Sequence, residues 1–463
     1  MTSITKPTRV TGVILLTLVL GGCDFITPVT TNPNAVPTAS VEQLFTAIQV
    51  NSYFLAEGQI SRIAAIWTQQ MAGTDRQFVS IDSYVITEED ANGEFSTVYT
   101  GGGLIDIRTA IALANDNGRR TFEGILKVHE AYMIGMTASI FGDIPYSEAA
   151  NADIAEPVLD GQAAVYAAIQ SLLDEAIADL GSGQAGVGGP GLADLSLGGD
   201  VAAWTAVAYT LKARFHIHWG ETTASAYVDA LAAAQNGIQD AAGTWKTIHS
   251  NAATENNLWF QFQRDRSGYI SSGDHLLALM DGDSDPRLYL WYSCQDPDKQ
   301  FPPDCDQTTI PGPAKARVSE LSPTGYGSSS FNLPMVSCAE NAFIIAEAQF
   351  AASNFAAAIT AAEDGLTCQE DEWSVDLAAQ ATAIGLLTGA PLLAAIMDQK
   401  YIALFLNAEV YNDYKRTCLP AITENTGGMP GRLFYGQDER QSNTNVPEPG
   451  AQPARNANDT NAC

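Results

Sequence analysis

Positively charged side chains are scarce in this sequence. The 463 residues include 23 Lys and Arg but 53 Asp and Glu, which gives a formal net charge of −30 at pH 7. Affinity for nucleic acid depends largely on cationic side chains that displace counterions from phosphates, and general attraction to anionic lipid head groups needs them too. The composition therefore argues against a nucleic-acid partner and against electrostatic binding to a membrane surface.

Charged residues of either sign are also few, at 16% of the chain, whereas 46% of the residues are hydrophobic. That apolar content is too high for a disordered chain, and the length far exceeds that of a disulfide-stabilised miniprotein. With ~150 residues per domain as a prior, the length suggests about three folding units or one large helical body.

The sequence has no apolar run long enough to cross a membrane. The run Val10–Leu20 has about 11 residues, whereas a helix needs ~20 to cross the hydrocarbon core. It follows Lys6 and Arg9 and is typical of the apolar region of a signal peptide. The sequence therefore predicts a signal peptide over residues 1–22.

The end of this segment, Leu20-Gly21-Gly22-Cys23, resembles the bacterial lipobox, in which the cysteine thiol receives diacylglycerol. We therefore expect lipid attachment at Cys23, followed by a flexible tether over residues 23–38 that is rich in Thr, Pro and Asn. An ordinary secretory signal with a chance cysteine is the alternative. If Cys23 is lipidated, the acyl group would be the only membrane attachment.

The other six cysteines form no CxxC motif and no Cys/His cluster with zinc spacing, so redox and structural-zinc functions are weakly supported. An even number of cysteines in an exported chain suggests disulfides, although six allow 15 connectivities. Cys294 and Cys305 bracket a short loop rich in Pro and Asp and are the expected pair.

Catalytic and cofactor motifs are missing as well. No GxGxxG, GxxxxGK[ST] or GxSxG pattern occurs, and His129-Glu130 fails as a metalloprotease motif because Met133 stands where the second histidine is needed. The stretch Asp281–Asp285 imitates the opening of a calcium loop, but Pro286 replaces the required glycine. We predict no cofactor and no metal site, and the sequence leaves calcium binding at this stretch open.

Helical periodicity dominates the rest of the chain. Asp160 is expected to cap one helix and Gly181 to end it, residues 245–335 read as mostly irregular, and the chain after Gln441 is expected to be extended or disordered. The apolar spacing predicts helices over residues 41–56, 60–71, 104–115, 122–139, 160–180, 202–219, 226–237, 342–352, 355–366, 374–387 and 391–408.

Two of these helices, over residues 342–352 and 355–366, are rich in alanine and resemble a tetratricopeptide-type (TPR-type) hairpin. Generic packing of alanine-rich helices explains the pattern almost as well.

Several aromatic residues stand among Gln, Asn, Ser and Asp rather than in apolar runs. Flat rings beside amide and hydroxyl groups suit a sugar, whose C–H face packs on the ring while its hydroxyls find polar partners. The alternative is that large aromatic side chains are buried in any core. The candidate ligand-binding residues are Trp67, Tyr84, Trp259, Tyr269, Trp291 and Tyr292.

Several motifs, in order, are similar to those of the SusD/RagB family. That family comprises lipid-anchored outer-membrane proteins that capture nutrients, mostly glycans, for TonB-dependent transporters. The matches extend from about residue 35 to 447. They include Phe141–Ala149 (FGDIPYSEA), Gly198–Asp200 with Trp204, Asp285–Leu288 (DPRL), Gln399–Phe405, Tyr411–Asp413 and Arg416.

The resemblance implies a mostly α fold, in which four TPR-like helical hairpins pack against a loop-rich region. The family domain would span residues 39–447, followed by a C-terminal tail over residues 448–463. Its TPR-like helices would lie mainly at 40–240 and 341–408, and its loop-rich ligand region at about 245–335. In this family, Asp143 and Pro145 would set a turn and Arg416 would form a buried ion pair. Ligand contacts vary between members, so none is transferred.

The function implied by the resemblance is non-catalytic. The protein would be lipid-anchored at the outer membrane, on the cell surface, and would hold a glycan or another small nutrient for a SusC-like TonB-dependent transporter. Asp24, directly after the lipidated cysteine, leaves the choice of leaflet open. Two alternatives remain: a TPR-type lipoprotein scaffold that binds protein or peptide, and a secreted glycoside hydrolase, although nothing selects a catalytic pair among the 53 acids.

Overall fold

The computed structural model describes residues 39–184, 188–294, 319–425 and 427–460, and of Cys294 it describes the backbone only. Val41–Cys463 forms one compact unit. The signal peptide, the lipid attachment at Cys23 and the tether fall outside the described residues. So does the Cys294–Cys305 pair, because neither cysteine side chain is among them.

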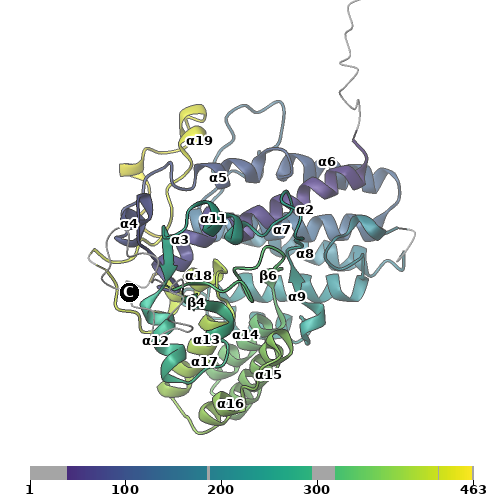
Figure 1. Cartoon of the computed structure of the whole chain (residues 1–463). Helices are drawn as coiled ribbons and strands as arrows, with labels where there is room; N and C mark the ends of the chain where they lie inside the picture. The colour runs from purple at the N-terminus through teal and green to yellow at the C-terminus, as the bar shows by residue number, and fades with distance from the viewer. Residues whose placement is uncertain (1–38, 185–187, 295–318, 426, 461–463) are drawn as a thin grey trace, which may run out of the picture. The chain divides into compact units, whose positions relative to one another are not determined.

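Helices account for most of the first half of this unit, and they follow the predicted segments closely (Figure 1). Apolar side chains at helical spacing must be buried on one face, and this requirement determines where the helices form. The helices are α2 (Val41–Glu57), α3 (Gln59–Trp67), α4 (Gln77–Asp82), α5 (Asn92–Tyr99), α6 (Leu104–Asp116), α7 (Arg120–Phe141), α8 (Gln162–Leu180), α9 (Val201–Ile217) and α10 (Ala226–Ala234).

Helix α7 lies at the centre of this half. Every residue from Thr121 to Phe141 is buried, and the helix contacts α2, α5, α6, α8 and α9. A helix that is buried on all sides must also pair its charged side chains, and Lys127 does so: its Nζ lies 2.9 Å from Glu123 and 2.8 Å from Asp179 on α8. The buried charges thus join α7 to α8.

The second helical group follows residue 337. Its helices are α14 (Cys338–Ala351), α15 (Phe355–Trp373), α16 (Ala378–Gly385), α17 (Ala390–Ala403), α18 (Glu409–Thr417) and α19 (Gln437–Ser442). Helix α14 packs against α9 and α10 of the first group as well as against α15 and α17. Figure 1 shows α14 to α17 together at the lower end of the view.

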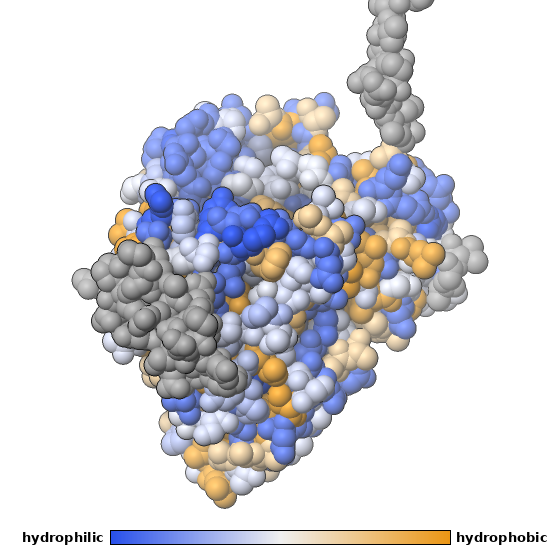
Figure 2. All heavy atoms as spheres, viewed as in Figure 1, coloured by the Kyte–Doolittle hydropathy of each residue, from blue (hydrophilic) through white to orange (hydrophobic). Residues whose placement is uncertain are grey.

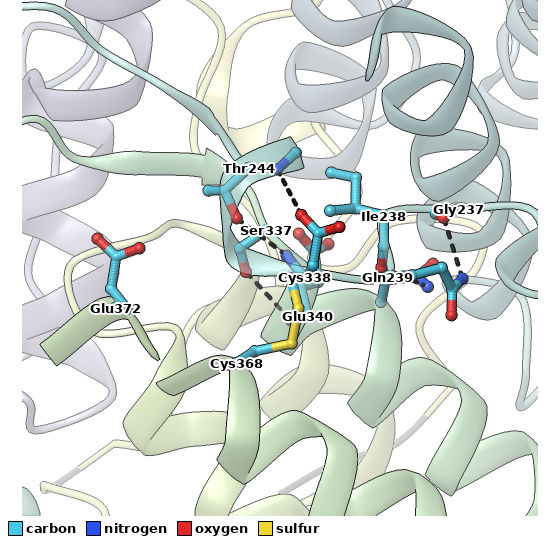
Figure 3. Close-up of a disulfide and its surroundings, with 12 residues drawn as sticks. Gly237, Ile238, Gln239, Thr244, Ser337, Cys338, Glu340, Cys368 and Glu372 are labelled. Atoms are coloured by element: carbon cyan, nitrogen blue, oxygen red, sulfur yellow. Dashed lines mark hydrogen bonds between the residues drawn. A yellow bond between two sulfur atoms is a disulfide. The ribbon is translucent and has the colours of Figure 1, made fainter. Parts of the chain in front are cut away.

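The alanine-rich pair is confirmed as a helical hairpin, α14 and α15, connected through Ser353 at φ 62°. A disulfide between Cys338 and Cys368 joins the two helices (Figure 3), with the two Cα atoms 5.9 Å apart. Ser337 begins α14 by accepting a hydrogen bond at its Oγ from the Glu340 N–H, 3.1 Å. The mostly helical fold class is confirmed, while the division into four TPR-like units stays a prediction.

Residues 245–335 are less irregular than predicted. They contain the short helices α11 (Leu258–Asp265), α12 (Asp274–Gly282) and α13 (Leu288–Trp291). Three two-stranded antiparallel sheets also involve this segment: β1 (Met71–Gly73) with β3 (Ile270–Ser272), β2 (Trp245–Lys246) with β6 (Pro334–Val336), and β4 (Tyr292–Cys294) with β5 (Ser319–Leu321). Sequence patterns missed these strands because two or three residues are too few to show a period.

Two boundaries differ from the predictions. Helix α8 begins at Gln162 after Gly161, and Asp160 does not cap it. The chain beyond Gln441 is also not a free tail. It packs against the helices, where the buried Asn456 donates from Nδ2 to Ser139 O, 2.7 Å, and Asn458 donates to His218 O, 3.1 Å. The packing of such a polar tail cannot be predicted from local sequence, because it depends on single hydrogen bonds to backbone groups that are distant in the sequence.

The predicted ion pair of Arg416 is confirmed. Its Nη2 lies 2.7 Å from Glu347 Oε2 and 2.6 Å from Asp413 Oδ1, and Lys400 Nζ lies 2.9 Å from Asp413. Burial alone would raise the pKa of Asp413, but the charges of Lys400 and Arg416 outweigh it and hold that pKa below its usual value. The group joins α14, α17 and α18.

Among the described helices, none has the length and apolar character that a membrane span requires.

Candidate ligand-binding site

A polar pocket of about 420 Å³ opens beside the β1–β3 strand pair. A volume of this size is within the range that small-molecule sites occupy. The wall combines carboxylate, amide, imidazole and hydroxyl groups with Met71 and Ala72 of β1 and with Gly273, which follows β3. The polar side chains on the wall are Gln69, Asp82, Asp274, His275, Thr423 and Asn425.

Hydrogen bonds fix one wall of the pocket. Gln69 follows α3 with a positive φ of 56° and donates from Nε2 to Thr423 O, 2.6 Å. Asn425 donates from Nδ2 to Asp82 O, 2.6 Å, and Asp82 Oδ1 accepts the Gly73 N–H, 3.0 Å. Segments that are far apart in the sequence are therefore held together at this wall.

The start of α12 forms another part of the wall. Burial raises the pKa of Asp274, and burial together with the charge of Asp274 raises the pKa of Asp82, although the Gly73 N–H opposes that shift. Burial lowers the pKa of His275, whose Nε2 has no hydrogen-bond partner in the described structure. The pocket thus presents carboxylate and amide groups, a set that suits a ligand rich in hydroxyl groups.

Two of the six predicted aromatic residues lie beside this pocket. The Tyr84 hydroxyl accepts the N–H of Asn425, 3.4 Å, and its ring packs edge-on against Trp67. Tyr269 directly precedes β3, and its carbonyl accepts the Thr74 N–H, 2.9 Å. Tyr269 is partly exposed, while Tyr84 is 9% exposed. Sequence reasoning identified these two rings but not the polar residues between them.

The other four predicted rings do not form an open platform. Trp67 and Trp259 are 0% and 2% exposed, and their indole N–H groups donate inside the protein, to Ile81 O at 3.0 Å and to Ser61 Oγ at 3.2 Å. Their polar sequence neighbours point elsewhere, so the rings are core residues.

Trp291 and Tyr292 are equally buried. The Trp291 ring stacks on Phe405 with centroids 5.0 Å apart, and the Tyr292 hydroxyl donates to Gln70 O, 2.5 Å. The expectation of a platform made from all six rings is corrected for these four, because packing against other core side chains buries each ring.

The DPRL motif forms a buried ion pair. Arg287 Nη2 lies 2.5 Å from Asp285 Oδ2 and 2.8 Å from Gln399 Oε1, so the last aspartate of the calcium-like stretch is already paired. Within the described ranges, no group of three or more His, Cys, Asp and Glu side chains is arranged to hold a metal ion.

The polar pocket residues carry no signal in the sequence. Asp82, Asp274, His275 and Asn425 are common residue types in unremarkable surroundings, and the positive φ of Gln69 has no sequence marker. Only the tertiary structure brings them together.

Comparison with known proteins gives a match over most of the chain. Residues 33–435 match the SusD-like family model described as "Starch-binding associating with outer membrane". No curated protein sequence matches the chain.

Solved structures with the same fold include a SusD-like protein from Bacteroides thetaiotaomicron, at 20% identity and a TM-score of 0.74 over 90% of this chain and 97% of that chain. A chitin-binding SusD homologue from Flavobacterium johnsoniae has 21% identity and a TM-score of 0.73, over 90% and 98% of the two chains. A SusD/RagB family protein, also from B. thetaiotaomicron, has 20% identity and a TM-score of 0.70, over 88% and 95%.

Proposed function

The chain belongs to the SusD/RagB family, and from this premise we propose that it is a non-catalytic protein that binds a glycan at the outer membrane and delivers it to a TonB-dependent transporter. In this proposal, lipid on Cys23 anchors the protein at the cell surface, and a SusC-like transporter is its partner.

The observation that carries the proposal is the polar pocket beside β1 and β3. Sugar hydroxyls are both donors and acceptors, and the wall offers carboxylates at Asp82 and Asp274 and an amide at Asn425. The partly exposed ring of Tyr269 lies next to β3, where it can pack against a sugar face. The family description and the chitin-binding relatives support carbohydrate as the ligand class.

Binding of the mature chain to a glycan panel, measured by calorimetry, tests the pocket. We expect Asp274→Asn and Asn425→Ala to weaken binding of the best glycan about tenfold each, because the first replaces a charged acceptor oxygen with an amide N–H and the second removes the amide from the wall. Asp281→Asn, at an exposed position of the same helix as Asp274, is the matched control and should bind like the unchanged chain. Equal affinity of all four proteins would place the glycan elsewhere.

Anchoring and delivery need separate tests. Cys23→Ser should move the protein from the membrane to the soluble fraction, and continued attachment would rule out lipidation. A transporter barrel should co-purify with the lipidated chain from outer membranes, whereas a chain that supports uptake without a barrel would contradict delivery.

One feature favours the scaffold alternative. An apolar pocket of about 300 Å³ between α8, α9 and α10 is lined by Tyr166, Phe215 and Trp219, and TPR-type grooves bind peptides through such surfaces. Binding of peptides but of no glycan would support that function. Turnover of any glycan by the isolated chain would instead support a hydrolase.

A further inference from the structure

Four arginines gather around α11, in a chain that has few cations. Other arginines are used in buried ion pairs, as Arg287 and Arg416 are. Figure 2 shows strongly hydrophilic surface where α11 lies in the same view of Figure 1. The arginine cluster consists of Arg62, Arg76, Arg264 and Arg266, and each guanidinium lies over an aromatic ring of this region.

Two of these arginines share one ring. The Cζ atom of Arg62 lies 4.6 Å from the centroid of Phe262, and that of Arg266 lies 5.6 Å from the same centroid. The face of a ring attracts a cation, but two guanidinium groups at one ring also repel each other. Burial is the main reason that the pKa of Arg62 is lowered to about 10; the charge of Glu94 opposes this shift, and the charge of Arg266 adds to it to a smaller extent.

Neither arginine of this pair forms an ion pair with a carboxylate in the described part of the chain. Arg62 Nε is buried without a hydrogen-bond partner, and its Nη2 makes only a long contact of 3.5 Å to Leu258 O. The side chain of Arg266 is exposed, with no hydrogen bond to another described residue. The guanidinium groups of this pair, above all the exposed one of Arg266, therefore have N–H donors that an anion could use.

The two carboxylates whose charges act on Arg62, Glu57 and Glu94, accept hydrogen bonds from other donors. Glu57 Oε1 accepts from His249 Nε2, 2.9 Å, and Glu57 Oε2 accepts the Leu258 N–H, 2.9 Å. Glu94 Oε1 accepts the Gln59 N–H, 2.8 Å. By contrast, Arg264 is already neutralised by its neighbour Asp265, at 2.7 and 2.9 Å.

The arginine pair adjoins the proposed glycan site. The Tyr269 N–H donates to Arg266 O, 3.1 Å, so the two residues belong to one turn before β3. The centroids of Phe262 and Tyr269 are 6.5 Å apart, and Arg76 lies 5.8 Å from the centroid of Tyr269. An anion at Arg62 and Arg266 would therefore be next to the partly exposed ring of Tyr269.

We propose that Arg62 and Arg266 bind the carboxylate or sulfate group of an acidic saccharide, whose sugar ring packs at Tyr269. This inference rests on the proposed function and names the substrate class of the same site. Planar guanidinium groups bind such oxyanions with paired hydrogen bonds, and an anion between two arginines removes their mutual repulsion. A net charge of −30 disfavours anions at long range, so the attraction must come from these local cations.

The test uses the mature chain and a panel of uronate-containing, sulfated and sialylated oligosaccharides with neutral counterparts of matching backbone. We expect the best ligand to be acidic. We also expect Arg266→Gln to weaken its binding about tenfold or more, because a charge-assisted hydrogen bond is lost. Arg266→Lys should recover only part of the affinity. Arg264→Gln is the matched control and should leave affinity unchanged. The exposed position of Arg266 keeps these variants folded, which thermal unfolding checks.

The outcomes separate this inference from the proposed function. Binding of neutral glycans alone, weakened by Asp274→Asn but not by Arg266→Gln, would overturn the acidic-ligand inference and keep the glycan-binding proposal. Acidic ligands that bind Arg266→Gln as well as the unchanged chain would also overturn it. Absence of binding to every glycan, acidic or neutral, would contradict both, and binding of cationic ligands would show that the net charge decides the ligand.

Discussion

The carboxylates of Asp143 and Asp160 each accept backbone hydrogen bonds from residues that closely follow the other aspartate in the sequence. Asp143 Oδ1 accepts the Gln162 N–H, 2.7 Å, at the start of α8, while Asp160 Oδ2 accepts the backbone N–H groups of Tyr146 and Ser147, at 3.0 and 2.7 Å. The FGDIP stretch, residues 141–145, thus forms a reciprocal clamp between α7 and α8, and the turn implied for Asp143 includes a helix cap.

This clamp predicts how its two carboxylates contribute to stability. Asp143→Ala should lower the free energy of unfolding by about 1 kcal/mol, the usual effect of losing a helix cap. Asp160→Ala should cost more, about 2 kcal/mol, since it leaves two backbone N–H groups without their acceptor. Asp153→Ala, at an exposed position of the same connection, is the control. Equilibrium denaturation measures all three, and equal effects of the three changes would contradict the clamp.

The buried charges around Arg416 predict a larger effect. Arg416→Met should destabilise the protein by about 3–5 kcal/mol, because Glu347 and Asp413 lose their strongest partner inside the core. Adding Glu347→Leu to that variant should recover part of the loss, since it removes the unpaired charge. Urea denaturation checks this pair of variants. If the loss in the double variant equalled the sum of the losses from Arg416→Met and Glu347→Leu alone, the two residues would act independently.

Asp398 predicts a pH-dependent effect. Burial, and to a smaller extent the charge of Asp283, raises its pKa to about 6. Its unfolded pKa is near 4, so the folded chain binds the extra proton between about pH 4 and 6, and the free energy of unfolding falls as pH rises through that range.

Asp398→Asn should therefore stabilise the protein by about 1–2 kcal/mol at pH 7.5 and much less at pH 4. Thermal and urea unfolding at both pH values provide the measurement. Asp281→Asn, exposed on α12, should show no such difference between the two pH values. If Asp398→Asn stabilised the protein equally at both pH values, ionisation of Asp398 would not be what destabilises the folded chain.

The disulfide between Cys338 and Cys368 closes a loop with a sequence separation of 30. Replacing both cysteines with alanine should lower the free energy of unfolding by about 2–4 kcal/mol. The double variant is a cleaner test than a reductant, because Cys418 is disulfide-bonded as well. An unchanged unfolding midpoint would show that packing of α14 on α15 suffices.

Peptide mapping of the unreduced protein tests the remaining cysteine prediction. It should recover Cys294 linked to Cys305 together with the Cys338–Cys368 peptide. Free thiols at Cys294 and Cys305 would reject the first pair and leave the second unaffected.

The sequence by itself determined the helical framework, as α7 and the α14–α15 hairpin illustrate. Apolar side chains at a period of 3.6 must share a buried face whatever they pack against, so this information is local. The family motifs added the ion pair of Arg416 and the turn at Asp143.

The direction in which each ring points was decided by the tertiary structure alone. Trp259 and Tyr269 both have polar residues two positions away on each side in the sequence, yet Trp259 is buried in the core and Tyr269 is partly exposed beside β3. The same holds for the pocket wall, where Asp82 meets Asn425 from a distant segment. Burial and encounters of this kind depend on long-range packing, which no local pattern of residues encodes.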